Sequence, residues 1–162
     1  MKPWLVSAIV LLISFSCRQD DDSDCWPADP KRNSDAVTIK QGLWGDVWLY
    51  EGDFAPICAS GSITPVERTI HIYQQATRKD AEVFEGTLIF FKTVKTDLIA
   101  TTTSNAKGFF EVYLEPGIYS VFVQEGDSLY ANRGTADGIN TVTISEGQVA
   151  ELLFEITYAR YF

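Results

Sequence analysis

The strongest constraint on the fold lies in residues 104–123, SNAKGFFEVYLEPGIYSVFV, where two alternating segments flank a tight turn. Every second residue is apolar across residues 110–114, and the same holds across residues 119–123. Successive side chains of a strand point to opposite faces, so each segment predicts a strand with one buried face. Residues 115–117, Glu-Pro-Gly, combine a fixed φ with a residue that tolerates positive φ. This pattern predicts a β-hairpin.

Further strand-like segments, separated by turn residues, occupy much of the remaining chain. We expect strands at residues 41–50, 67–74, 98–103, 141–145 and 149–158, the last two forming a second hairpin across Glu146-Gly147. Residues 51–65 and 125–140 are predicted to be loops because they are rich in turn residues, and residues 87–91 could be a short strand or a packed loop. About seven strands in this spacing predict an all-β fold, a Greek-key β-sandwich.

The charge balance argues against nucleic acid as a partner. The chain has 13 Lys and Arg against 22 Asp and Glu, a formal net charge of −9. An acidic surface repels the phosphate backbone of DNA or RNA and equally disfavours electrostatic docking on anionic lipid.

Residues 1–16 have the pattern of a secretion leader. Lys2 supplies a positive start, and an apolar run follows that is too short to span a bilayer. Ser16-Cys17 comes next, and the whole resembles a bacterial lipoprotein leader, in which the cysteine is acylated and becomes the new N-terminus. Ser14 and Phe15 depart from the usual leucine and small residue. The alternative is an ordinary cleaved leader followed by a chance cysteine.

Residues 17–37 are expected to form a lipidated acidic tether and a polar linker, with the β-domain at residues 38–162. Residues 18–24, RQDDDSD, resemble the acidic signal that follows the lipidated cysteine in surface-exported lipoproteins of Bacteroidota. The alternative is a solvated tether, which charge runs commonly are. The resemblance implies an outer-membrane lipid anchor with exposure on the cell surface.

Two cysteines remain if Cys17 carries lipid. Cys25 and Cys58 would lie in an oxidising compartment, which allows a disulfide between the linker and the domain. Two unpaired thiols are the alternative, because the sequence supplies no distance between them.

A longer pattern resembles the carboxypeptidase regulatory-like domain over residues 41–158. It consists of Gly45-x-Val47, Pro56, SNAKGFF at residues 104–110 and LEPGIYSVFV at residues 114–123. Ser104-Asn105 stands where that family often has Thr-Asp. The resemblance implies a transthyretin-like sandwich of seven strands. Members of that family are non-catalytic modules attached to enzymes, transporters and adhesins, so it also implies an interaction or scaffold role.

Catalytic and metal-binding patterns are sparse. His71 is the single histidine, and no G-x-S-x-G nucleophile motif occurs. Two cysteines and one histidine make no zinc set. Asp127, Asp137 and Asn140 carry oxygen ligands, but their spacing matches no calcium loop. We therefore predict no catalytic residues, no metal and no cofactor.

The remaining anomaly is aromatic. Trp44, Trp48 and Tyr50 alternate with apolar residues that must face the core, so they occupy the opposite strand face, where polar residues are usual. Exposed, they would form a candidate binding face for a glycan or a protein. Alternatively, the linker, residues 76–97 or Tyr161-Phe162 cover them. The sequence thus predicts a non-enzymatic cell-surface lipoprotein acting as an interaction or scaffold module in an envelope assembly, with carbohydrate binding as the alternative.

Overall fold

A computed structural model describes residues 26–57 and 59–162, and these residues form an all-β fold. They contain thirteen strands and two short 3-10 segments, η2 (Ser34–Ala36) and η3 (Arg78–Asp80), without an α-helix in the described ranges. None of the helical segments described has the length and apolar character needed to cross a bilayer. The expectation of an all-β fold is confirmed.

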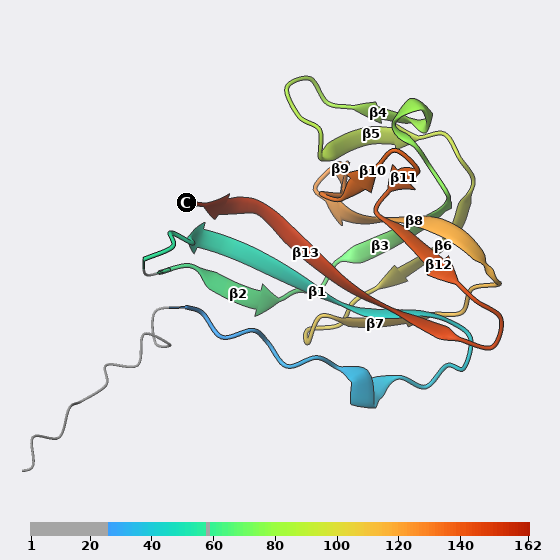
Figure 1. The fold of residues 1–162 in the computed structure, drawn as a ribbon, viewed down its shortest axis with the longest axis horizontal. Coiled ribbons are helices and arrows are strands. Elements are labelled where there is room, and N and C mark those ends of the chain that lie inside the picture. The colour runs from blue at the N-terminus through green and yellow to red at the C-terminus, as the bar shows by residue number, and fades with distance from the viewer. Residues whose placement is uncertain (1–25, 58) are drawn as a thin grey trace, which may run out of the picture.

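The first sheet is organised around one long strand, β1 (Gly42–Asp53). β13 (Val149–Tyr161) runs parallel to it along one edge (Figure 1). Along its other edge β1 pairs first with β7 (Phe109–Val112) and then with β2 (Ser62–Pro65), both antiparallel. Each of the other three strands of this sheet is therefore hydrogen-bonded to β1.

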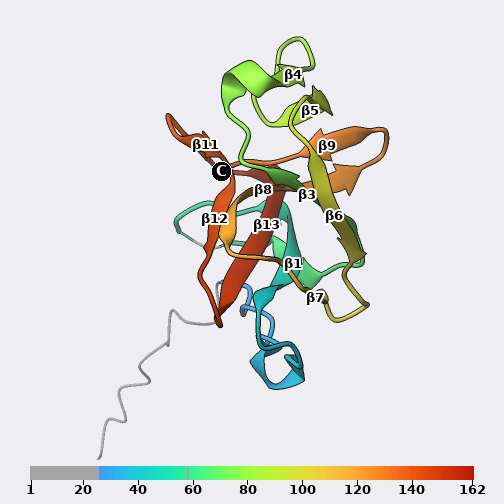
Figure 2. The same cartoon turned by 90° about the vertical axis from the view of Figure 1, so that its right-hand side faces the viewer.

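The second sheet has the order β4-β5-β9-β8-β3-β6, and β12 also pairs with β8. Its strands are β3 (Thr69–Gln74), β4 (Ala81–Val83), β5 (Phe90–Val94), β6 (Leu98–Thr103), β8 (Gly117–Glu125), β9 (Ser128–Tyr130) and β12 (Thr141–Ile144). β10 (Gly134–Thr135) and β11 (Gly138–Ile139) form a separate two-residue pair. Figure 2 shows β4 and β5 at the end of the molecule remote from the blue segment that contains η2.

The predicted central hairpin is wrong, although its buried faces are correct. β7 pairs with β1, whereas β8 pairs with β3, β9 and β12, so residues 113–116 cross from one sheet to the other. Phe110, Leu114, Tyr119 and Val121 are all buried in one core, which they enter from opposite sides. Alternation identifies the inward face of a strand but not its hydrogen-bonding neighbour, because both arrangements bury the same side chains.

The predicted C-terminal hairpin is wrong for the same reason. β12 pairs with β8 in the second sheet, and β13 pairs with β1 in the first. The Glu146-Gly147 turn therefore joins two sheets instead of two paired strands. Phe154 and Ile156 still face the main core, as their alternation predicts.

The main core fills the space between the two sheets. Its buried members are Leu43, Val47, Leu49, Ile70, Ile72, Phe110, Leu114, Tyr119, Val121, Val123, Tyr130, Ile144, Phe154 and Ile156. A second cluster lies on the outer side of the second sheet, where the rings of Phe91 and Phe122 pack edge to face with their centres 5.3 Å apart. Residues 81–94 thus cover aromatic surface that β8 would otherwise expose.

The structure has more strands than the seven expected. β2 lies within predicted loop 51–65, and β9, β10 and β11 lie within predicted loop 125–140. These strands span two to four residues, which is too short for a period-two pattern to stand out from turn composition.

Gly45 gives a direct test of the packing around β1. A Cβ on this residue would lie 2.2 Å from the Leu152 carbonyl oxygen and 2.8 Å from the Phe110 ring. We expect Gly45→Ala to lower the free energy of unfolding by about 3 kcal/mol, because backbone of the neighbouring strand must move. Gly134→Ala is the control, since the nearest atom, Arg78 Nη2, is 3.6 Å away. Equal urea midpoints for the two variants would contradict this packing.

Candidate functional site

The outer face of β1 carries the three aromatic residues singled out by the sequence, together with one carboxylate. Trp44, Trp48 and Tyr50 are only 7%, 3% and 7% exposed, and Asp46 is fully buried. Leu43, Val47 and Leu49 face the main core. The three aromatic rings therefore lie on one face of β1, as the alternation predicts, but that face is buried.

The two tryptophans are covered by the segment that precedes β1, residues 26–41, here called the arm. Its Arg32 lies over this face, with the guanidinium carbon 5.5 Å from the centre of the Trp44 ring and 5.6 Å from that of Trp48. Arg32 Nε donates to Asp46 Oδ2 at 2.6 Å. Its Nη2 lies 2.8 Å from Glu151 Oε1 on β13. A cation over two indole faces and beside a carboxylate combines cation–π attraction with a charge-assisted hydrogen bond.

Asp46 receives further hydrogen bonds from the arm. Asn33 Nδ2 donates to Asp46 Oδ1 at 2.6 Å and also to the Lys107 carbonyl at 2.9 Å. A buried carboxylate is costly unless a positive partner and hydrogen-bond donors compensate it. Arg32 and Asn33 supply both, so the burial of Asp46 depends on the arm staying in place.

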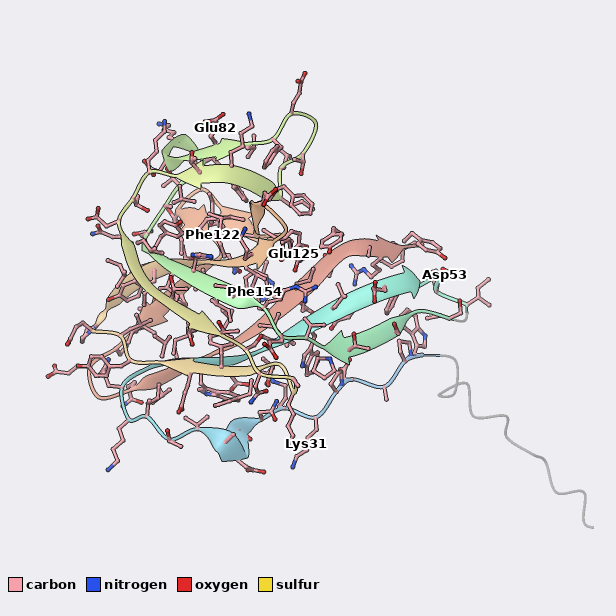
Figure 3. All side chains as sticks on the ribbon, turned by 180° about the vertical axis from the view of Figure 1, so that it is seen from behind. Lys31, Asp53, Glu82, Phe122, Glu125 and Phe154 are labelled. Carbon is pink, nitrogen blue, oxygen red and sulfur yellow. The ribbon has the colours of Figure 1, made fainter. Side chains whose placement is uncertain are left out.

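A second set of contacts holds the arm where it joins β1. The Thr38 amide and hydroxyl donate to the Glu111 carboxylate at 2.8 and 2.5 Å, and these bonds lower the pKa of Glu111. Gln41 Nε2 donates to the Leu114 carbonyl, and Gln41 Oε1 accepts from the Gly147 amide. The arm is thus held on the domain at its middle, by Arg32 and Asn33, and at the end that joins β1, by Thr38 and Gln41 (Figure 3, near Lys31).

Tyr50 lies at the far end of the aromatic face. It packs against Phe54, with ring centres 5.7 Å apart, and lies under the Arg160 guanidinium. Its hydroxyl donates to Glu155 Oε1 at 2.9 Å, and Glu155 also pairs with Arg133. Burial first, and the hydrogen bond to Glu155 second, raise the pKa of Tyr50 far above its usual value. The phenol therefore stays protonated and acts as a structural donor.

An open groove of about 530 Å³ runs beside the arm. Its lining includes Arg32 and Asn33 on one side and Pro65 and Lys107 on the other, and none of the three aromatic rings. A flat sugar ring could not stack on Trp44 or Trp48 from this groove while Arg32 occupies the space above them. The predicted binding residues and the groove are thus separate features.

The remaining candidates have structural roles or lie outside the described residues. His71 sits between Thr101 and Phe122 on the second sheet, and burial lowers the pKa of its imidazole. Asn140 Nδ2 donates to the Val121 carbonyl. Residues 26–57 and 59–162 contain no group of three His, Cys, Asp or Glu side chains placed to hold a metal ion. Cys17, Cys25 and Cys58 are outside the described residues.

The pairing of Arg32 with Asp46 is not evident from the sequence. Asp46 had a detectable signal, since it is the single charged residue in QGLWGDVWLY. Arg32 lies in a segment without periodicity, where no pattern marks its partner. No protein-family model, curated protein or solved structure matches the chain.

The Arg32–Asp46 pair makes a prediction with a control one residue away. We expect Arg32→Ala to lower the free energy of unfolding by about 3 kcal/mol, because it leaves a buried carboxylate without its cation. Lys31 pairs with Asp35 on the exposed side of the arm, both side chains being 87% exposed. Lys31→Ala should change stability by about 0.5 kcal/mol or less. Similar denaturant midpoints for both variants would refute a structural role for Arg32.

The covered rings make a second prediction. Trp48→Ala should cost about 3–5 kcal/mol, because it empties the space between β1 and the arm. Trp44 is nearer the start of the strand, so Trp44→Ala should lower the free energy of unfolding by less, about 2 kcal/mol. Thermal unfolding of the two variants measures both losses. Unchanged midpoints for both would show that the rings contribute little to packing and would favour a binding role.

Proposed function

We propose that the chain is a non-enzymatic lipoprotein of the cell surface, held in the outer membrane by lipid on Cys17, with a β-domain that acts as an interaction or scaffold module. The observation that carries the proposal is the docked arm. Residues of the arm, which follows the acidic tether in sequence, are fixed on the first sheet by Arg32 bound to Asp46 of β1 and by Thr38 bound to Glu111 of β7. A tether joined to a fixed arm suits a module that is displayed at a set distance from its anchor.

The transthyretin-like, Greek-key arrangement belongs to this proposal. Two sheets around one core, and connections that pass between the sheets, support it. The motif residues Gly45, Phe110 and Tyr119 are buried within that core or packed against it. They support the fold, as in a module whose role is structural.

A scaffold role is better supported than carbohydrate binding. Stacking a sugar needs exposed aromatic faces, whereas Trp44, Trp48 and Tyr50 are at most 7% exposed. Glycan binding on this face would require the arm to leave and Asp46 to lose its partners. A non-catalytic role is also supported by the use of Asp46, Glu111 and Tyr50 as structural hydrogen-bonding groups.

The anchor is tested by labelling cells with radioactive palmitate. We expect label in the parent protein and none in Cys17→Ser, because the thiol of Cys17 is the proposed acceptor. Cys25→Ser is the matched control and should keep the label. An unlabelled parent, or a Cys17→Ser variant that stays labelled, would refute the lipoprotein assignment.

A further inference from the structure

Large apolar side chains are exposed where β1 and β13 end. Trp26, Ile57, Tyr161 and Phe162 are 48%, 94%, 62% and 75% exposed. They come from three segments distant in sequence, namely the start of the arm, the loop after β1 and the end of β13. We call these four residues the tip.

The tip is built on one buried residue, Phe54. The ring centre of Trp26 lies 6.3 Å from that of Phe54, and the Phe54 amide donates to the Tyr161 carbonyl at 2.9 Å. The Arg160 guanidinium lies 5.8 Å from the Phe54 ring and 4.9 Å from the Phe162 ring. Figure 3 labels Asp53 at this end of β1, on the side of the molecule where the arm begins. The exposed side chains therefore share one supported end of the first sheet.

The chain between the tip and Cys17 is short. Trp26 is the ninth residue after Cys17, and nine residues span at most about 32 Å when fully extended. A lipid on Cys17 would thus keep the tip within that distance of the headgroups. The opposite end of β1 lies about 37 Å from the tip, because the strand has twelve residues, so the tether does not hold that end equally close.

The composition of the tip suits the interface of a neutral bilayer. Tryptophan and tyrosine are enriched at the level of the headgroups, where an apolar ring and a polar edge are both accommodated. A second apolar contact linked to a lipid anchor adds to the overall membrane affinity and restricts how the domain is oriented. The net charge of −9 opposes both an anionic lipid surface and pairing with a second copy of the chain.

We propose that the tip docks into the headgroup region of a neutral phospholipid bilayer. This inference rests on the lipid anchor at Cys17 proposed above. Anchor and tip then act as two linked contacts, and the domain holds one orientation instead of swinging on its tether. The Gly42 end of β1 points away from the membrane.

Tryptophan fluorescence tests the docking, because Trp26 is largely exposed while Trp44 and Trp48 are buried. The lipidated mature protein is reconstituted into phosphatidylcholine vesicles whose acyl chains are or are not brominated. We expect bromine to remove the Trp26 share of the emission, since bromine quenches indole at short range. Trp26→Phe keeps an apolar ring at the tip and should show equal emission in both vesicles.

A control variant separates docking from general stickiness. Tyr113 is 59% exposed at the opposite end of β1, where its Cα would touch a Cβ on Gly42. Phe162→Ser should reduce the quenching of Trp26, whereas Tyr113→Ser should leave it unchanged. Equal emission of the lipidated parent in both vesicles would overturn the proposal while leaving the anchor intact. A dimer in solution that Phe162→Ser dissociates, without quenching, would instead assign the tip to self-association.

The unlipidated mature chain, residues 17–162 with Cys17→Ser, keeps the inference testable if Cys17 carries no lipid. Its partitioning into phosphatidylcholine vesicles should fall about tenfold in Trp26→Ser, the loss expected from one partly buried aromatic side chain. If this chain does not bind the vesicles and the parent carries no palmitate, the docking and the proposed function both fail. If the parent protein carries palmitate but brominated lipid does not quench Trp26, the docking proposal fails and the lipid anchor stands.

Discussion

The structure depends on β1 being buried on both faces. Its inner face enters the main core. Its outer face carries two tryptophans and a carboxylate that the arm covers, and a tyrosine that packs against Phe54. A strand in a two-layer β fold normally has one wet face. β1 therefore needs a cover from elsewhere in the chain, and the arm supplies it through Arg32. Because β2, β7 and β13 all pair with β1, that cover supports the whole first sheet.

The chemistry of the cover explains why it is specific. An apolar arm could cover Trp44 and Trp48 in several positions along the strand. Because a buried carboxylate is costly without a positive partner, only the position that places a cation beside Asp46 is stable. Arg32 satisfies this demand and also lies over both indole rings. Asn33 adds a bond that reaches the Lys107 carbonyl beside β7. Arg32 and Asn33 thus tie the arm to β1 through Asp46, to β13 through Glu151 and to the turn before β7 through Lys107.

The inward faces of strands could be predicted from the sequence, whereas partners could not. Alternation correctly placed Leu43, Val47, Phe110 and Phe154 in the core. It failed for β7–β8 and β12–β13, because a turn between two alternating segments permits either a hairpin or a crossing between sheets. Of the candidate site, the common face of the three aromatic rings was predictable. The Arg32–Asp46 contact was not, since it joins a segment without periodicity to a strand fourteen residues away.

On both sheets, aromatic side chains of the outer face are buried under another segment of the chain. The arm covers Trp44 and Trp48 on the first sheet, while Phe91 of β5 covers Phe122 on the second. The parts of the outer faces that carry Trp48 and Phe122 are consequently occupied by the chain itself and offer no platform to a flat ligand. The proposed recognition of a partner would then use the ends of the sandwich. At one end lie the exposed rings of Trp26, Tyr161 and Phe162. With the lipid anchor proposed above, that end would face the membrane, and the Gly42 end of β1 and the far end of the second sheet would remain for a partner (Figure 1).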